Sequence, residues 1–275
     1  MPKKVSKIEP PIIEAKNVVK NFGKIEAVKG ISFAITPGEI FAFLGPNGAG
    51  KSTTIKMLTT MLRPTSGELY LNGHDVTRER DSARKSFGIV FQDPAVEEEL
   101  TAYENMLFHA VLYGVPKNIQ KPKIKELLRL VDLWERKDSL VRTYSGGMRR
   151  RLEIARGLLH EPKILFLDEP TLGLDTQTRN VLWDYVKKLS QSQGMTIFFT
   201  THYLDEAEQV AERIAIIDHG KIVAEGTNKQ LTAQTKTRSL EEAYLKLTGE
   251  GIRDEVSEDN NGLNVRAGLR NQSLR

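Results

Sequence analysis

Segment 45–52 has the residue types and the spacing to bind phosphate groups. It reads Gly-Pro-Asn-Gly-Ala-Gly-Lys-Ser and matches the G-x-x-x-x-G-K-[ST] phosphate loop. The backbone amides of residues 48–50 can converge on phosphates because no side chain obstructs them, and the dipole of a following helix adds favourable charge. Lys51 is expected to reach the β and γ phosphates, and Ser52 to offer its hydroxyl to magnesium. The segment therefore predicts a site for ATP and Mg²⁺.

Two adjacent carboxylates follow the apolar run 164–167. Asp168 and Glu169 would close a strand at the C-terminal edge of a parallel sheet, where such folds bind ligands. Asp168 is expected to hold magnesium through water, and Glu169 to orient or deprotonate the attacking water as a general base. Taken alone, the pair could be a solvated strand end. Together with the phosphate loop it predicts hydrolysis of ATP.

A second anion site is predicted where Ser145-Gly146-Gly147 opens a helix. The free amides and the serine hydroxyl at a positive helix end suit a phosphate. The two phosphate-binding elements are far apart in the chain, so both can serve one ATP only if two copies meet head to tail. For the tripeptide alone, an ordinary serine N-cap is the alternative.

Apolar runs predict the strands that position these groups. A helix is expected over 51–62, directly after the phosphate loop, and another over 240–247. The expected strands cover 12–19, 27–35, 40–44, 68–71, 87–91, 164–167, 195–199 and 214–217. Strands separated by amphipathic segments are typical of an α/β fold with a mainly parallel sheet.

A helical subdomain is expected between the strands of this core. Residues 100–160 show no convincing strand, whereas Leu107, Val111 and Leu112 have helical spacing. We expect the subdomain to occupy about 93–161 within a domain spanning 11–250. The polar segments 1–10 and 251–275 are expected to be flexible tails.

Composition narrows the classes of partner. The 275 residues include 40 basic and 36 acidic side chains, a mixed surface that does not favour nucleic acid. Arg149, Arg150 and Arg151 would fan over different helix faces and are expected to be solvated or paired, without a role in the site. There are no cysteines, no signal peptide is visible, and no apolar run is long enough to span a membrane.

The order of these motifs resembles the ATP-binding subunit of ABC transporters over about residues 12–249. The resemblance implies a P-loop ATPase core with an N-terminal antiparallel β subdomain and the inserted helical subdomain. It implies that Phe22 stacks on adenine, that Gln92 contacts magnesium and water, that Asp175 crosses a dimer interface and that His202 touches the γ-phosphate. The implied nucleotide contacts are Gly45, Asn47, Gly48, Ala49, Gly50, Lys51, Ser52, Thr53, Ser145, Gly146 and Gly147. Lys51, Gln92, Glu169 and His202 are the implied catalytic residues, and Ser52, Gln92 and Asp168 the implied magnesium ligands.

Three segments resemble the ABC-2 export branch, particularly the daunorubicin-resistance type. They are residues 144–152, 171–175 and 240–244. The resemblance implies a homodimeric ATPase at the cytoplasmic face of the cell membrane, attached to the membrane only through a separate permease. We expect that permease to dock near residues 92–104.

Two other functions remain open at this point. One is a soluble ABC ATPase that acts on a partner unrelated to transport, and the other is a regulatory module that binds ATP without turnover. Relatives of the first kind usually carry two ATPase units, a long coiled-coil insertion or metal-binding cysteines, none of which is present. Glu169 argues against the regulatory module, because modules of that kind often lose this carboxylate. His202 and Glu206 are one helical turn apart, but with no third ligand nearby a zinc site is not expected.

Overall fold

The computed structural model describes residues 9–93 and 95–249 of the 275-residue chain. The predicted tails, 1–10 and 251–275, lie almost entirely outside the described residues. The strands are β1 (Ile13–Phe22), β2 (Ile25–Ile35), β3 (Ile40–Leu44), β4 (Ser66–Leu71), β5 (His74–Asp75), β6 (Phe87–Val90), β7 (Ile164–Asp168), β8 (Thr196–Thr201), β9 (Arg213–Asp218) and β10 (Lys221–Gly226). The helices are α1 (Lys51–Leu58), α2 (Arg80–Lys85), α3 (Ala102–Leu112), α4 (Lys117–Leu130), α5 (Gly146–Gly157), α6 (Thr176–Gln193), α7 (Leu204–Val210), α8 (Asn228–Thr235) and α9 (Leu240–Thr248).

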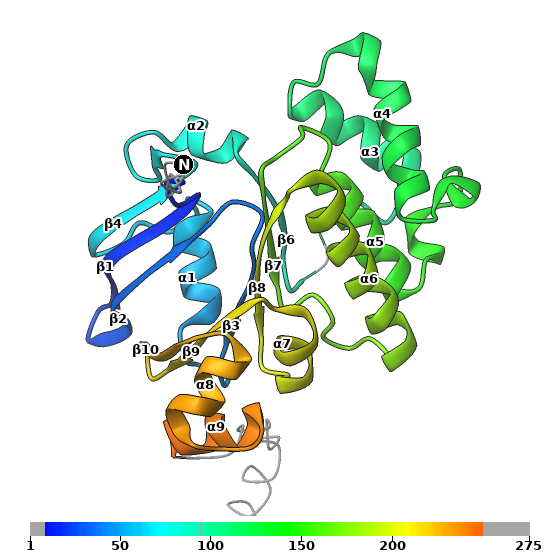
Figure 1. Cartoon of the computed structure of the whole chain (residues 1–275). Coiled ribbons are helices and arrows are strands. Elements are labelled where there is room, and N and C mark those ends of the chain that lie inside the picture. Colours follow the sequence, from blue (N-terminus) through cyan, green and yellow to red (C-terminus); the bar gives the residue numbers. More distant parts are fainter. Residues whose placement is uncertain (1–8, 94, 250–275) are drawn as a thin grey trace, which may run out of the picture.

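Two sheets enclose α1, as Figure 1 shows. The antiparallel sheet has the order β2-β1-β4-β5, and the other has the order β10-β9-β3-β8-β7-β6. Ile55, Met57 and Leu58 of α1 are fully buried in the cluster of apolar side chains shared by both sheets. This burial holds the start of α1, and with it the phosphate loop, at a fixed place between the two layers.

The larger sheet gathers the chemically active segments at one edge. Strands β9, β3, β8, β7 and β6 run parallel, so their carboxyl ends meet at the same edge, and only β10 is antiparallel. The phosphate loop follows β3, Asp168 ends β7, His202 follows β8 and Gln92 follows β6. Parallel strand order thus brings together residues that are far apart in the sequence.

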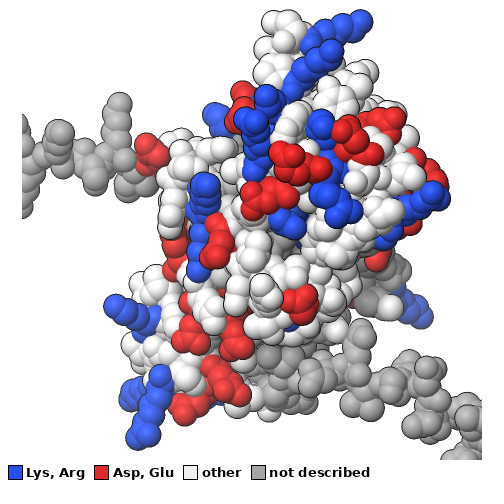
Figure 2. Space-filling view, turned by 90° about the vertical axis from the view of Figure 1, so that its right-hand side faces the viewer, with Lys and Arg blue, Asp and Glu red and all other residues white. Residues whose placement is uncertain are grey.

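A helical group covers the far side of the larger sheet. In Figure 1, α3, α4, α5 and α6 gather beside β6 and β7, whereas α8 and α9 lie near β9 and β10. The helices between Ala102 and Gly157 fall within the range expected for the inserted subdomain. Figure 2 views the molecule from this side and shows acidic and basic side chains interspersed over its surface.

Several predicted boundaries are wrong. Helix α1 ends at Leu58 instead of residue 62, because Thr60 has a φ of 64° and the chain unwinds into the turn before Pro64.

Helix α3 lies where apolar spacing predicted a helix, but Val111 and Leu112 are 61% and 65% exposed. Met106 and Ala110 fill the buried face of α3 instead.

Strand β10 and helix α8 were not predicted from the sequence. Strand β10 is bounded by Lys221 and Gly226, and its burial pattern mixes exposed and buried positions because it is an edge strand. Among residues 9–93 and 95–249, no helix has the length and apolar character needed to cross a bilayer.

Candidate nucleotide site

The phosphate loop folds tightly between β3 and α1 because two of its glycines leave no room for a side chain. A Cβ on Gly45 would lie 2.2 Å from the Ile217 carbonyl oxygen, and one on Gly50 would lie 2.7 Å from the Ala27 carbonyl oxygen. Gly50 also has a φ of 108°, which L-amino acids with side chains rarely adopt. The loop's backbone amides therefore surround the N-terminus of α1, where a phosphate is favoured.

Lys51 extends over this loop from the first turn of α1. Its Nζ donates hydrogen bonds to the carbonyl oxygens of Gly45 (2.7 Å) and Pro46 (3.1 Å) and lies 3.0 Å from Glu169 Oε1. The side chain is almost completely buried. Lys51 thus links the phosphate loop to Glu169 at the end of β7. A γ-phosphate entering the loop would compete with Glu169 for the positive charge of Lys51.

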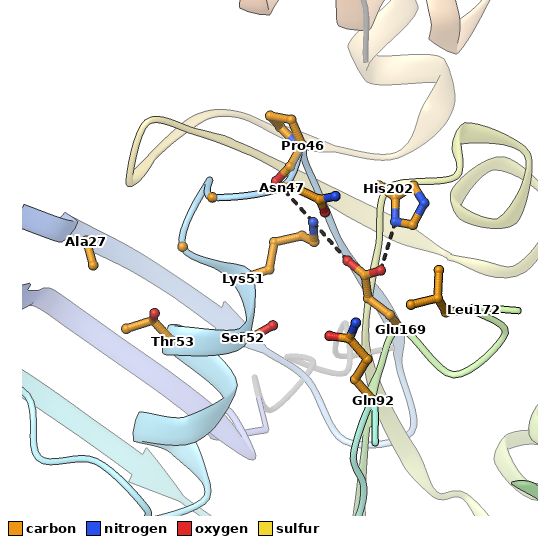
Figure 3. A pocket seen from close by; sticks show the side chains of 12 residues that line it. Ala27, Pro46, Asn47, Lys51, Ser52, Thr53, Gln92, Glu169, Leu172 and His202 are labelled. Atoms are coloured by element: carbon orange, nitrogen blue, oxygen red, sulfur yellow. Dashed lines mark hydrogen bonds and ion pairs between the residues drawn. The ribbon is translucent and has the colours of Figure 1, made fainter. Parts of the chain in front are cut away.

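Glu169 lies between two cationic or hydrogen-bonding partners, as Figure 3 shows. Its Oε2 is 2.8 Å from His202 Nδ1, and its other oxygen faces Lys51. Burial would raise the pKa of Glu169, but the His202 hydrogen bond and the Lys51 charge outweigh it and hold that pKa below its ordinary value. Glu169 is therefore ionised at neutral pH, as a general base must be.

The backbone of Glu169 is strained. Its φ is 46°, in the left-handed region that side-chain-bearing residues seldom occupy. The Glu169 amide donates to the Thr200 carbonyl oxygen (3.2 Å) and to Thr200 Oγ1 (3.0 Å), which secure this conformation. Two hydrogen bonds to β8 thus aim the carboxylate at the phosphate loop.

Asp168 and Ser52 offer oxygen ligands of the type that Mg²⁺ prefers. Ser52 Oγ donates to Asp168 Oδ1 at 3.2 Å, and Thr200 Oγ1 donates to the same oxygen at 2.6 Å. Burial raises the pKa of Asp168, and these two hydroxyls oppose that rise. A bound cation would favour the ionised carboxylate. The donor set of Ser52, Asp168 and the amide oxygen of Gln92 fits magnesium.

A cavity of about 470 Å³ joins these groups into one site. It opens between the loop and the strand ends, with Lys51 and Glu169 pointing toward each other across it (Figure 3). Nine residues predicted from the sequence line it: Asn47, Gly48, Gly50, Lys51, Ser52, Thr53, Gln92, Glu169 and His202. Gly45 and Ala49 complete the same loop, and Asp168 lies beside it at the end of β7.

The remaining predicted residues lie outside this cavity. Phe22 is exposed at the end of β1, with Lys20 Nζ 5.0 Å from its ring centroid. Ser145 is the exposed N-cap of α5, and its hydroxyl accepts a hydrogen bond from the Met148 amide at 3.3 Å. Asp175 caps α6 by accepting from the Thr178 amide at 2.9 Å. One chain therefore does not bring its two predicted phosphate-binding elements together.

Gly146 and Gly147 of the segment Ser145-Gly146-Gly147, called the signature segment from here on, lie against the start of α6. A Cβ on Gly147 would lie 2.1 Å from the Thr178 methyl carbon, whereas one on Gly146 would have its nearest neighbour, a Leu174 methyl carbon, at 3.5 Å. Thr178 also donates to Asp175 Oδ2 at 2.7 Å. Gly147 of the signature segment and Asp175 therefore both lie against Thr178, which links the start of α5 to the start of α6.

Some residues of the site were not found from the sequence. Ala27 and Leu172 line the cavity, and Thr200 Oγ1 donates to the Asp168 carboxylate and accepts from the Glu169 backbone amide. Glu206 accepts from Thr171 and from Thr201, at 2.8 Å in the second case, so it ties the segments after β7 and β8 together. Among the described residues, no three His, Asp or Glu side chains are grouped closely enough to hold a metal ion by themselves.

The fold and the site define a P-loop ATPase. The family model described as ABC transporter matches residues 28–172, and the chain belongs to the ABC transporter family as an ATP-binding and ATP-hydrolysing subunit. It is 46% identical over 228 residues to the daunorubicin/doxorubicin resistance ATP-binding protein DrrA of Streptomyces peucetius, covering 83% of this chain and 69% of that relative. It is 41% identical over 243 residues to the linearmycin resistance ATP-binding protein LnrL of Bacillus subtilis (strain 168), covering 88% of this chain and 76% of that relative.

Solved structures agree with this assignment. An ATP-binding subunit of an ABC transporter superposes with a TM-score of 0.78 at 30% identity, covering 86% of this chain and 99% of that one. The dimeric post-hydrolysis state of the cassette MJ0796, bound to ADP and Pi, superposes with a TM-score of 0.70 at 29% identity, covering 78% and 98%. The predictions of the P-loop fold, of ATPase activity and of an exporter ATPase of the ABC-2 branch are confirmed.

Proposed function

We propose that this subunit binds two Mg-ATP molecules between two copies of itself and drives a separate ABC-2 permease from the cytoplasmic face of the membrane. The observation that carries the proposal is the division of the site within one chain. The phosphate loop, Glu169 and His202 form one half, and the exposed Ser145 end of α5 lies outside their cavity. Each half is completed by the other half of a second copy.

The chemistry of closure follows from this arrangement. The exposed N-terminus of α5 presents free amides and a hydroxyl, which suit the γ-phosphate held by the partner's loop. ADP lacks that phosphate, so hydrolysis removes the contacts that stabilise the closed dimer. The solved dimer of MJ0796 with ADP and Pi supports a cycle of this kind in the family.

The first test removes the predicted phosphate contact. Ser145→Arg is expected to abolish ATP-driven dimerisation and to lower ATPase activity at least tenfold, because the arginine fills the space of the partner's phosphate. Activity at increasing protein concentration and light scattering measure both effects. Ser239→Arg is the matched control, since Ser239 is also a helix N-cap and its hydroxyl accepts from the Glu242 amide at 3.2 Å. Parental activity in Ser145→Arg would rule out the shared site.

The permease contact is proposed at a hollow next to the nucleotide site. This hollow has a volume of about 350 Å³ and lies where the segment after β6 leaves the larger sheet. It is lined by Ser52, Lys56, Met61, Phe91, Gln92, Asp93, Ala95 and Asp168. A permease segment seated there would touch residues that also line the nucleotide cavity. Helix α3 also carries exposed apolar residues, Phe108, Val111 and Leu112.

Crosslinking tests this contact in the complete transporter. A photoreactive amino acid in place of Met61, which is 57% exposed, is expected to crosslink to the permease. The same group in place of Val223, an exposed apolar residue on β10, serves as the control and is expected to give no permease product. Equal crosslinking from both positions, or crosslinking from Val223 alone, would contradict the proposed docking site.

The cargo is proposed to be selected by the permease. The relatives are named for resistance to daunorubicin and doxorubicin, for resistance to linearmycin and for export of Nod factor, although their ATP-binding subunits are similar to this one. A partner unrelated to transport is the second candidate. Co-purification of the subunit with a membrane protein favours the transporter, and its recovery only with soluble partners favours the second candidate.

A further inference from the structure

Helix α5 carries three buried charged residues that face the segment after β6. Arg150, Glu153 and Arg156 are 6%, 1% and 5% exposed, which is unusual for charged side chains. They lie one helical turn apart along the same face of α5. The segment they face contains Gln92, which lines the nucleotide cavity.

All three side chains bind the backbone of that segment. Arg150 donates to the carbonyl oxygen of Phe91 and, at 2.8 Å, to that of Gln92. Glu153 accepts from the Ala95 amide at 2.6 Å, and Arg156 donates to the Ala95 carbonyl oxygen. Arg150 and Glu153 also form an ion pair of 2.9 Å. Side chains of α5 therefore satisfy backbone groups on both sides of Gln92.

These contacts differ from the other arginine contacts of the same helix. Arg149 pairs with the exposed Glu98, and Arg151 donates to the Val131 carbonyl oxygen at 3.0 Å within the helical group. Exposed ion pairs such as that of Arg149 with Glu98 contribute little to stability. Leaving a buried charge without its partner is costly, so replacing Arg150, Glu153 or Arg156 is expected to disturb the segment that it binds.

We infer that Arg150, Glu153 and Arg156 are positioning residues that make Gln92 and Ser145 move together. Ser145 caps the same helix, whose 12 residues form a rod about 18 Å long. The inference rests on the proposed dimer, in which Ser145 meets the partner's nucleotide while Gln92 faces its own. Nucleotide bound in one half of the dimer then favours the closed position of the residues that serve the other half.

A double-mutant cycle tests the inference in the full chain with the Glu169→Gln substitution. The readout is the midpoint of dimerisation, which is the ATP concentration at which half of the protein is dimeric, measured by light scattering. Gln92→Ala and Arg150→Met are each expected to raise it roughly 2- to 30-fold, the range typical of coupling residues. Because Arg150 acts through the Gln92 segment, the double variant is expected to be no worse than the more affected single variant.

Two further variants keep the test decisive. Arg150→Lys retains the charge beside Glu153 but loses the forked donor geometry of the guanidinium. It is expected to shift the midpoint less than Arg150→Met does. This shift is expected to disappear when Gln92→Ala is also present. Arg151→Met removes a similar arginine-to-carbonyl bond from the same helix and is expected to leave the midpoint unchanged. ATP binding to the isolated monomer is expected to stay at the parental affinity in all of these variants except Gln92→Ala.

The outcomes separate the two proposals. Shifts that add in the double variant, or an equal shift in Arg151→Met, would show a general structural role and overturn the inference. Failure of Glu169→Gln itself to dimerise with ATP would overturn the proposed function instead.

Discussion

Glu169→Gln is expected to bind ATP, to lose its hydrolysis and to accumulate as an ATP-bound dimer. The substitution removes the carboxylate that His202 and Lys51 keep ionised, and general bases contribute roughly 100- to 10,000-fold to such rates. The amide keeps nearly the same shape, so the phosphate loop still receives the nucleotide. Because the γ-phosphate is no longer removed, the contacts that close the dimer persist.

Phosphate release and analytical ultracentrifugation measure these two effects of Glu169→Gln. Glu212→Gln, at an exposed glutamate, is the control and is expected to hydrolyse ATP at the parental rate. Hydrolysis at the parental rate in Glu169→Gln would show that another group activates the water. A monomer at saturating ATP, both alone and in the complete transporter, would contradict the shared site.

Lys51→Ala is expected to weaken ATP binding itself. Lys51 supplies the buried positive charge of the site, and losing its charge-assisted hydrogen bonds to phosphate corresponds to roughly a 10- to 150-fold loss of affinity. The substitution also removes the Lys51 ion pair of Glu169, so the uncompensated carboxylate repels the phosphates more strongly. Lys51→Ala and Glu169→Gln therefore fail at different steps.

Titration of a fluorescent ATP analogue without magnesium measures this affinity. Lys56→Ala is the matched control, because Lys56 lies one turn later on α1 but is exposed and does not line the nucleotide cavity. An unchanged affinity in Lys51→Ala would show that the loop amides hold the phosphates by themselves. Equal losses in both variants would point to a nonspecific effect of net charge.

The chemistry of the phosphate loop was predictable because its residues are contiguous. Its glycines lie in the turn between β3 and α1, and Lys51 and Ser52 are the first two residues of α1, so their spacing determines their geometry. The position of Asp168 and Glu169 was predictable for a similar reason, since an apolar run ends directly before them. The supporting role of Thr200 was not, because it depends on which strand pairs with β7.

Element boundaries and buried faces were less predictable. The apolar residues Leu107, Val111 and Leu112 have the helical spacing that predicted a helix here, yet Val111 and Leu112 are exposed while the small Ala110 is buried. Helical spacing shows that a face is apolar, but the packing of neighbouring helices decides which face is covered. An interface with another protein leaves the same sequence pattern as a core.

The sequence by itself determined the phosphate chemistry, the carboxylate pair and the alternation of strands and helices in the core, because each of these depends on neighbouring residues. Only the tertiary structure decided how α5 is linked to the Gln92 segment. Arg150 and Arg156 reach carbonyl oxygens 59 and 61 residues earlier in the chain. Such contacts arise from the way a helix packs against a sheet, and no local periodicity encodes that distance.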